Sequence, residues 1–180
     1  MRLSIFDVPE LYSKYDKEIS YRRIGTLVDN CKVNVAKEDI KVTKLLKVRQ
    51  SKIQTIIRNC ILDFSNPIMS SDSLYDKKVS YSNHLTLLNT VGIHSLHGNG
   101  WWYYPKYLGF FSVDAIIPKD TEYITGLDGY NPKCGIIVSK QLLIPKIEII
   151  DSYREGKVIY YILQQGDLVY QSAELIEYGR

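Results

Sequence analysis

The sequence has little of several features that would assign it to a particular class of protein. It has three cysteines, Cys31, Cys60 and Cys134, which are odd in number, far apart and without a Cys-x-x-Cys pair. A disulfide framework needs an even number at closer spacing, so we expect free, buried thiols. The chain also lacks a run of 18 apolar residues and a long apolar segment near its N-terminal methionine. These absences argue against a membrane-spanning helix and a secretory signal, and we expect a cytoplasmic protein with no membrane partner.

What remains is the composition of an ordinary globular domain. The chain has 180 residues, of which 45% are hydrophobic and 24% charged. We expect a single domain over residues 1–180. Isoleucine occurs 22 times and tyrosine 15 times, but alanine only three times. Isoleucine, tyrosine, lysine and asparagine share AT-rich codons, which favours an AT-rich source such as a phage.

The net charge of +3 is unevenly distributed along the chain. Between positions 37 and 58 seven basic residues face two acidic ones, which leaves +5 in this segment and −2 in the remainder. The basic residues are Lys37, Lys41, Lys44, Lys47, Arg49, Lys52 and Arg58. Such an excess favours an anionic partner, which is RNA or DNA, a nucleoprotein or the acidic surface of a host protein. The alternative is a solvated helix face, although such a face usually mixes charges of both signs.

Hydrophobic periodicity predicts a mainly helical part over residues 1–70. Apolar residues from Val42 to Phe64 recur at intervals of three and four, which is typical of an amphipathic helix. Its basic residues lie on the opposite face, with a break near Arg49-Gln50-Ser51 as an alternative to one long helix. A shorter helix is predicted over residues 9–18, and the segment 19–35 fits either a helix or a strand.

The part from residue 71 onwards has the pattern of β-structure. Strands are predicted over residues 109–117, 121–125, 135–144 and 168–170. Residues 147–153 and 157–163 predict a hairpin with Gly156 in its loop. Helices followed by strands indicate an α+β domain, with N-terminal helices packed on a mainly antiparallel C-terminal sheet.

The three histidines, His84, His94 and His97, are candidates for a ligand pocket, with a purely structural role as the alternative. Their spacing and the absence of a nearby cysteine argue against a zinc site, and we expect neither a metal nor a cofactor. His94 is the best candidate for a catalytic base, but no serine or cysteine can be paired with it from the sequence.

Four consecutive aromatic residues follow the Gly98-Asn-Gly100 turn: Trp101, Trp102, Tyr103 and Tyr104. In an extended segment neighbouring side chains point to opposite faces, so all four cannot enter one core. We interpret them as a contact surface for a partner or for stacked bases, with a segment buried on both sides as the alternative.

Residues 91–144 resemble a group of uncharacterised small phage-encoded proteins, especially those of Bacteroidetes phages. The shared pieces are Gly-Ile-His-Ser (92–95), Ile-Ile-Pro-Lys-Asp-Thr-Glu-Tyr (116–123), an Asp-Gly turn (128–129) and Ile-Val-Ser-Lys-Gln-Leu-Leu-Ile (137–144). The resemblance implies a phage origin and carries no activity with it.

The C-terminal half is also similar, more faintly, to the corresponding half of ADP-ribosyltransferases in its order of strand, Pro-Lys-x-Thr, loop, strand and hairpin. That resemblance implies a shared architecture. The Ser-Thr-Ser element of the family is absent, and the strand that should carry the catalytic glutamate has no acid.

The sequence therefore predicts a small, non-enzymatic phage protein that acts by binding. An inhibitor of a bacterial defence system, such as an anti-CRISPR protein, fits this description. The alternatives are an ADP-ribosyltransferase-like nucleotide-binding enzyme, with His84 or His94 in its pocket, and a phage virion component.

Overall fold

The computed structural model describes residues 25–28, 32–56, 58–80, 86–96, 109–128 and 135–176. In these ranges the chain forms strands and no helix, so the predicted α+β class is wrong and the described structure is all-β. The strands are β1 (Gly25–Val28), β2 (Asn34–Val35), β3 (Ile40–Arg49), β4 (Lys52–Thr55), β5 (Ile68–Ser70), β6 (Tyr75–Ser80), β7 (Thr86–Thr90), β8 (Ile93–Leu96), β9 (Phe111–Ile117), β10 (Glu122–Asp128), β11 (Gly135–Ser139), β12 (Gln141–Leu143), β13 (Glu148–Glu155), β14 (Val158–Gln165) and β15 (Leu168–Leu175). None of the described residues belongs to a helix with the length and hydrophobicity of a membrane span.

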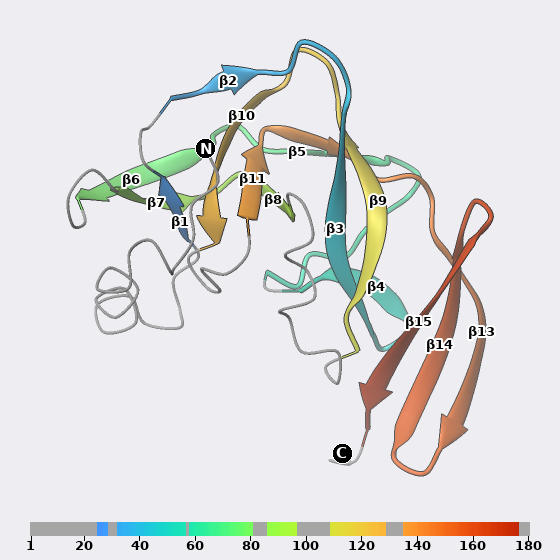
Figure 1. Cartoon of the computed structure of the whole chain (residues 1–180). Coiled ribbons are helices and arrows are strands. Elements are labelled where there is room, and N and C mark those ends of the chain that lie inside the picture. The colour runs from blue at the N-terminus through green and yellow to red at the C-terminus, as the bar shows by residue number, and fades with distance from the viewer. Residues whose placement is uncertain are drawn as a thin grey trace.

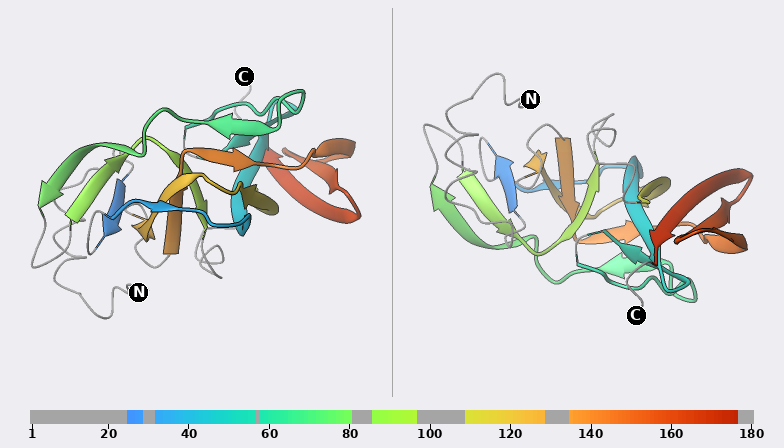
Figure 2. Two further views of the ribbon diagram at one scale, coloured as in Figure 1. Left: turned by 90° about the horizontal axis from the view of Figure 1, so that it is seen from above. Right: turned by 90° about the horizontal axis from the view of Figure 1, so that it is seen from below.

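The strands form two sheets, in which the described pairings are antiparallel (Figure 1). The larger sheet has twelve strands in the order β5-β12-β9-β3-β8-β11-β10-β1-β7-β6, with β2 paired to β10 and β4 paired to β3. The smaller sheet has the order β13-β14-β15. Figure 2 shows β6 and β7 at one end of the molecule and the smaller sheet at the other, with β3 and β9 between them.

The main apolar cluster lies where β3 and β9 face the smaller sheet. It gathers buried residues of several strands, among them Val42, Leu46 and Val48 of β3, Val113 and Ile117 of β9, and Tyr161 and Leu163 of β14. Burial of a large apolar side chain contributes roughly 1.5–3 kcal/mol. This cluster therefore joins the two sheets and fixes the position of β3.

The predicted helix over residues 42–64 is replaced by strands β3 and β4. Gln50 and Ser51 form the turn between them, with positive φ values of 54° and 62°. Leu45 and Leu46 are both buried although they are neighbours, because each face of β3 is covered: Leu46 belongs to the main cluster, and Leu45 packs with Leu96 and Ile136. A strand covered on both faces loses the simple alternation of apolar and polar residues, and its pattern can match that of a helix.

The predictions for the second half are confirmed in their main points. Strand β9 ends immediately before Pro118, and β13 and β14 form the predicted hairpin with Gly156 at a φ of +59°. The ambiguous segment over residues 19–35 contains strands β1 and β2. The predicted helix over residues 9–18 lies outside the described ranges, and the single domain over 1–180 stays a prediction.

The turn between β3 and β4 is held against the smaller sheet by a buried carboxylate. The main-chain N–H of Gln50 donates to both carboxylate oxygens of Glu174 at 3.1 Å, and the Tyr161 hydroxyl donates to Oε1 at 2.8 Å. Both Glu174 and Tyr161 are buried. Burial and the bond to Glu174 raise the pKa of the Tyr161 hydroxyl. A turn with two non-glycine residues at positive φ is sparsely populated in an isolated chain. The hydrogen bonds that Glu174 accepts from the Gln50 N–H therefore contribute to the stability of this turn.

We expect Glu174→Ala to lower the free energy of unfolding by about 2–3 kcal/mol, because it leaves the Gln50 N–H and the hydroxyl of the buried Tyr161 without their acceptor. Urea unfolding measures the change. Glu155→Ala, an exposed position on β13, is the control and should change stability by less than about 0.5 kcal/mol. Equal effects of the two variants would show that Glu174 does not hold the turn.

Candidate functional site

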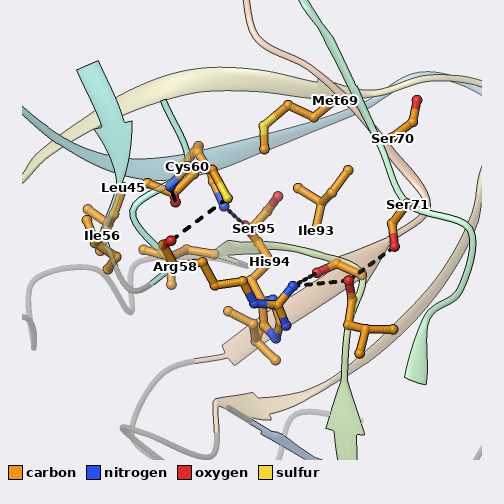
Figure 3. Close-up of a pocket in the computed structure, with 16 residues that line it drawn as sticks. Leu45, Ile56, Arg58, Cys60, Met69, Ser70, Ser71, Ile93, His94 and Ser95 are labelled. Carbon is orange, nitrogen blue, oxygen red and sulfur yellow. Dashed lines mark hydrogen bonds between the residues drawn. The ribbon is translucent and has the colours of Figure 1, made fainter. Parts of the chain in front are cut away.

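A pocket opens beside the middle of β3, where β8 diverges from it. Only one pair of residues, Thr43 and Leu96, joins these two strands in the described ladder. The pocket has a volume of about 210 Å³. Its walls come from five places in the chain: Lys44 and Leu45 of β3, the end of β4 with the segment after it, residues 69–71, residues 91–96 of the β7–β8 turn and β8, and Ile136 of β11 (Figure 3).

Lys44 places an ammonium group inside the protein at this pocket. Its side chain is only 8% exposed. Its Nζ donates a hydrogen bond to the main-chain oxygen of His94, and so bridges β3 and β8 where the backbone ladder between them has ended. Burial, and then the charge of Arg58, lowers the pKa of Lys44 from 10.5 to about 8. The group is therefore mostly protonated at neutral pH, in an environment that disfavours its charge.

Arg58 brings a second cation to the pocket wall. Its guanidinium donates to the main-chain oxygens of Thr90, Val91 and Gly92, the first at 2.5 Å and the second at 3.1 Å. These bonds tie the segment after β4 to the β7–β8 turn (Figure 3). Gly92 allows the turn to approach β11 closely, because a Cβ there would lie 2.7 Å from Val138 Cγ1 and 3.0 Å from the Ser139 oxygen. The hydrogen bonds of its guanidinium therefore give Arg58 a structural role, in addition to the positive charge that it brings to the pocket wall.

His94 is a partly buried, neutral ring at the pocket. Its Nε2 lies 2.7 Å from the Thr90 hydroxyl, and Thr90 Oγ1 lies 3.4 Å from Thr26 Oγ1, so the ring ends a polar chain through β1, β7 and β8. Burial, followed by the charges of Lys44 and Arg58, lowers the pKa of His94 to about 3. An imidazole with this pKa does not carry a proton at neutral pH and is a weak general base.

Two further groups at the pocket are potential nucleophiles, Ser95 and Cys60. Ser95 is 2% exposed, and its hydroxyl has no hydrogen-bond partner among the described residues. An unpaired buried hydroxyl costs about 1–3 kcal/mol. Cys60 is free, as predicted, but exposed rather than buried, and its Sγ contacts the Arg58 main-chain oxygen at 4.0 Å. Neither group is bonded to His94. The hydroxyl that contacts its Nε2 belongs to Thr90, which is only 1% exposed.

The structure places the seven predicted basic residues in different environments. Lys44, Lys47 and Arg58 bond to main-chain oxygens, and of these Lys44 is buried, Lys47 is half-buried and Arg58 is exposed. The Lys47 Nζ donates to the Ile56 oxygen at 3.0 Å. Lys37, Lys41 and Lys52 are exposed. Arg49 is partly buried and donates to the Val48 oxygen at 2.8 Å. The seven residues therefore follow β3 and its flanks and do not form one helical ridge.

The other predicted site residues are only partly placed. His94 lies at the pocket, whereas His84, His97, Trp101, Trp102, Tyr103 and Tyr104 lie outside the described ranges. Within those ranges no group of three or more histidine, cysteine, aspartate or glutamate side chains is arranged to hold a metal ion.

Sequence reasoning did not identify Ser95 as a pocket residue or Lys44 as a buried one. The sequence does contain one indication that Lys44 is buried: it stands among Val42, Leu45 and Leu46, and a segment this apolar does not form a solvated face. The Gly-Ile-His-Ser segment (92–95) forms one wall of the pocket.

Comparisons of the chain with protein-family models, with curated proteins and with solved structures found no match.

The pKa of His94 predicts a dependence of stability on acid. The native ring stays neutral between about pH 6.5 and pH 3, whereas the ring in the unfolded chain takes up a proton below 6.5. Unfolding therefore binds a proton in this window, and stability falls as the pH decreases. Allowing for the partial exposure of the ring, we expect a loss of about 1–2 kcal/mol between pH 7 and pH 5.

His94→Gln removes this proton uptake while keeping polar groups at the same place. Urea unfolding at pH 7 and at pH 5 should show a smaller loss of stability for the variant than for the natural protein. The same loss in both proteins would mean that His94 titrates normally in the folded state.

Proposed function

We propose that the protein is a non-enzymatic binding protein and that its partner is anionic, with nucleic acid as the favoured class. The observation that carries the proposal is the basic segment of residues 37–58, whose exposed lysines have no carboxylate partner in the described part of the chain. The ion pairs between described residues, Lys140–Glu122 and Lys146–Glu148, involve neither Lys37, Lys41 nor Lys52.

The spacing of these lysines supports an extended partner. Lys37 and Lys41 lie at one end of β3, and Lys52 lies beyond the other end. A strand of ten residues is about 30 Å long, so the exposed charges are distributed over a distance comparable to several nucleotides. A phosphate backbone presents negative charge over such a length, whereas an acidic patch on a protein is more compact.

The chemistry of the pocket supports binding rather than catalysis. His94 is neutral and bonded to Thr90, and the described lining contains no carboxylate that would act as an acid or a base. An ADP-ribosyltransferase-like enzyme remains the second candidate, because His94 does line a pocket, and calorimetric titration with NAD tests it. The narrower assignment, an inhibitor of a bacterial defence system encoded by a phage, stays a prediction of the sequence.

The test is binding of fluorescent single-stranded RNA, single-stranded DNA and duplex DNA, measured by anisotropy at several salt concentrations. We expect affinity to fall with salt, and Lys41→Glu combined with Lys52→Glu to weaken binding at least tenfold and to reduce the salt slope by about 2. The control combines Lys140→Glu with Lys146→Glu, which changes the net charge equally at lysines that are already paired.

Two results would contradict the favoured partner. Absence of binding to all three nucleic acids at low salt would exclude nucleic acid, and an acidic peptide probe would then test the protein alternative. Equal effects of the two double variants would show that binding follows net charge and not the basic segment.

A further inference from the structure

We propose that the pocket between β3 and β8 binds the carboxylate of a small apolar acid, with Lys44 Nζ and the Ser95 hydroxyl as its hydrogen-bond donors. This inference goes beyond the binding of an anionic macromolecule and does not depend on it, because it rests on buried groups and not on the exposed lysines.

The first support is a buried cation with no carboxylate partner among the described residues. Lys44 is almost completely buried, and no carboxylate pairs with it in the described ranges. One of its N–H groups is used by the His94 oxygen, so two remain. Burial of an ammonium is costly unless it is paired, and an anion in the pocket would supply the missing charge.

The second support is the Ser95 hydroxyl on the same wall. It is buried without a hydrogen-bond partner among the described residues, although its side chain lines the pocket next to His94 (Figure 3). Buried hydroxyls in folded proteins normally have a partner. A carboxylate accepts hydrogen bonds through two oxygens, so one oxygen can accept from Ser95 while both accept from Lys44.

The number of available donors favours a carboxylate over a phosphate. Arg58 contributes positive charge, but its guanidinium is held by three main-chain oxygens of the β7–β8 turn. His94 Nε2 is engaged by Thr90. Among the buried side chains of the lining, Lys44 and Ser95 have donors to spare, which suits a monoanion with two oxygens.

The rest of the lining determines the body of the ligand. Apolar side chains make up much of the wall, among them Leu45, Ile56, Met69, Ile93 and Ile136. An engineered apolar cavity of about 150 Å³ binds benzene, so a pocket of about 210 Å³ accommodates a body of similar size with its carboxylate. Benzoate combines these properties and is the probe for the test.

The experiment measures benzoate binding to the full chain at pH 7 by NMR titration, with benzyl alcohol and phenyl phosphate as comparison ligands. We expect benzoate to shift the resonances of residues 44 and 93–95 and to bind at least about tenfold more tightly than either comparison ligand. Lys44→Met should weaken benzoate binding at least about tenfold, and Ser95→Ala about threefold. Lys146→Met, at an exposed lysine of the loop before β13, is the control and should leave binding unchanged.

Several results would overturn the proposal. Benzoate that binds no tighter than benzyl alcohol, or that binds equally well to Lys44→Met, would exclude a carboxylate site at Lys44. Phenyl phosphate binding more tightly than benzoate would replace the carboxylate by a phosphate. If Lys44→Met does not fold, the Ser95→Ala variant provides the test. Benzoate binding with unchanged affinity to that variant would show that the Ser95 hydroxyl does not donate to the carboxylate, which contradicts the proposed site. Nucleic-acid binding that persists after any of these results leaves the proposed function standing.

Discussion

The architecture depends on β3 being covered on both of its faces. One face, with the side chains of its neighbour β9, packs against the smaller sheet through Val42, Leu46 and Val48, and the other contributes Leu45 to a second apolar cluster with β8 and β11. A strand in this position cannot send a lysine to solvent from its middle. Lys44 is therefore retained in the interior, and the protein must supply polar contacts for an ammonium group there.

Main-chain oxygens supply those contacts. Where β8 separates from β3, the His94 oxygen accepts from Lys44, and the oxygens of the β7–β8 turn accept from Arg58. Cations thus replace backbone N–H groups as donors, and the gap between the strands becomes a pocket rather than a continuous ladder. Burial, together with the same two charges, keeps His94 neutral, so the polar residues around the pocket are suited to holding a ligand more than to moving a proton.

How far the sequence predicted this arrangement differs between its two halves. The C-terminal strands have turn residues at their ends and alternating side chains, so Pro118 and Gly156 marked their limits correctly. The helix predicted over the β3–β4 segment was wrong because both faces of β3 are buried. Burial on both faces produces apolar residues at intervals of three and four without a helix. Its turn, Gln50-Ser51, also lacks the glycine or asparagine that normally identifies a hairpin. The pocket itself depends on long-range contacts between β3, β8 and the segment after β4, which no local pattern encodes.

The most direct test is the pKa of the Lys44 ammonium, measured by NMR of its side-chain carbon and nitrogen, without and with benzoate. Burial beside Arg58 predicts a titration near pH 8 in the free protein, and a bound carboxylate should move it upwards. A lysine that titrates near 10.5 and does not respond to benzoate would show that Lys44 is solvated and that the pocket holds no anion.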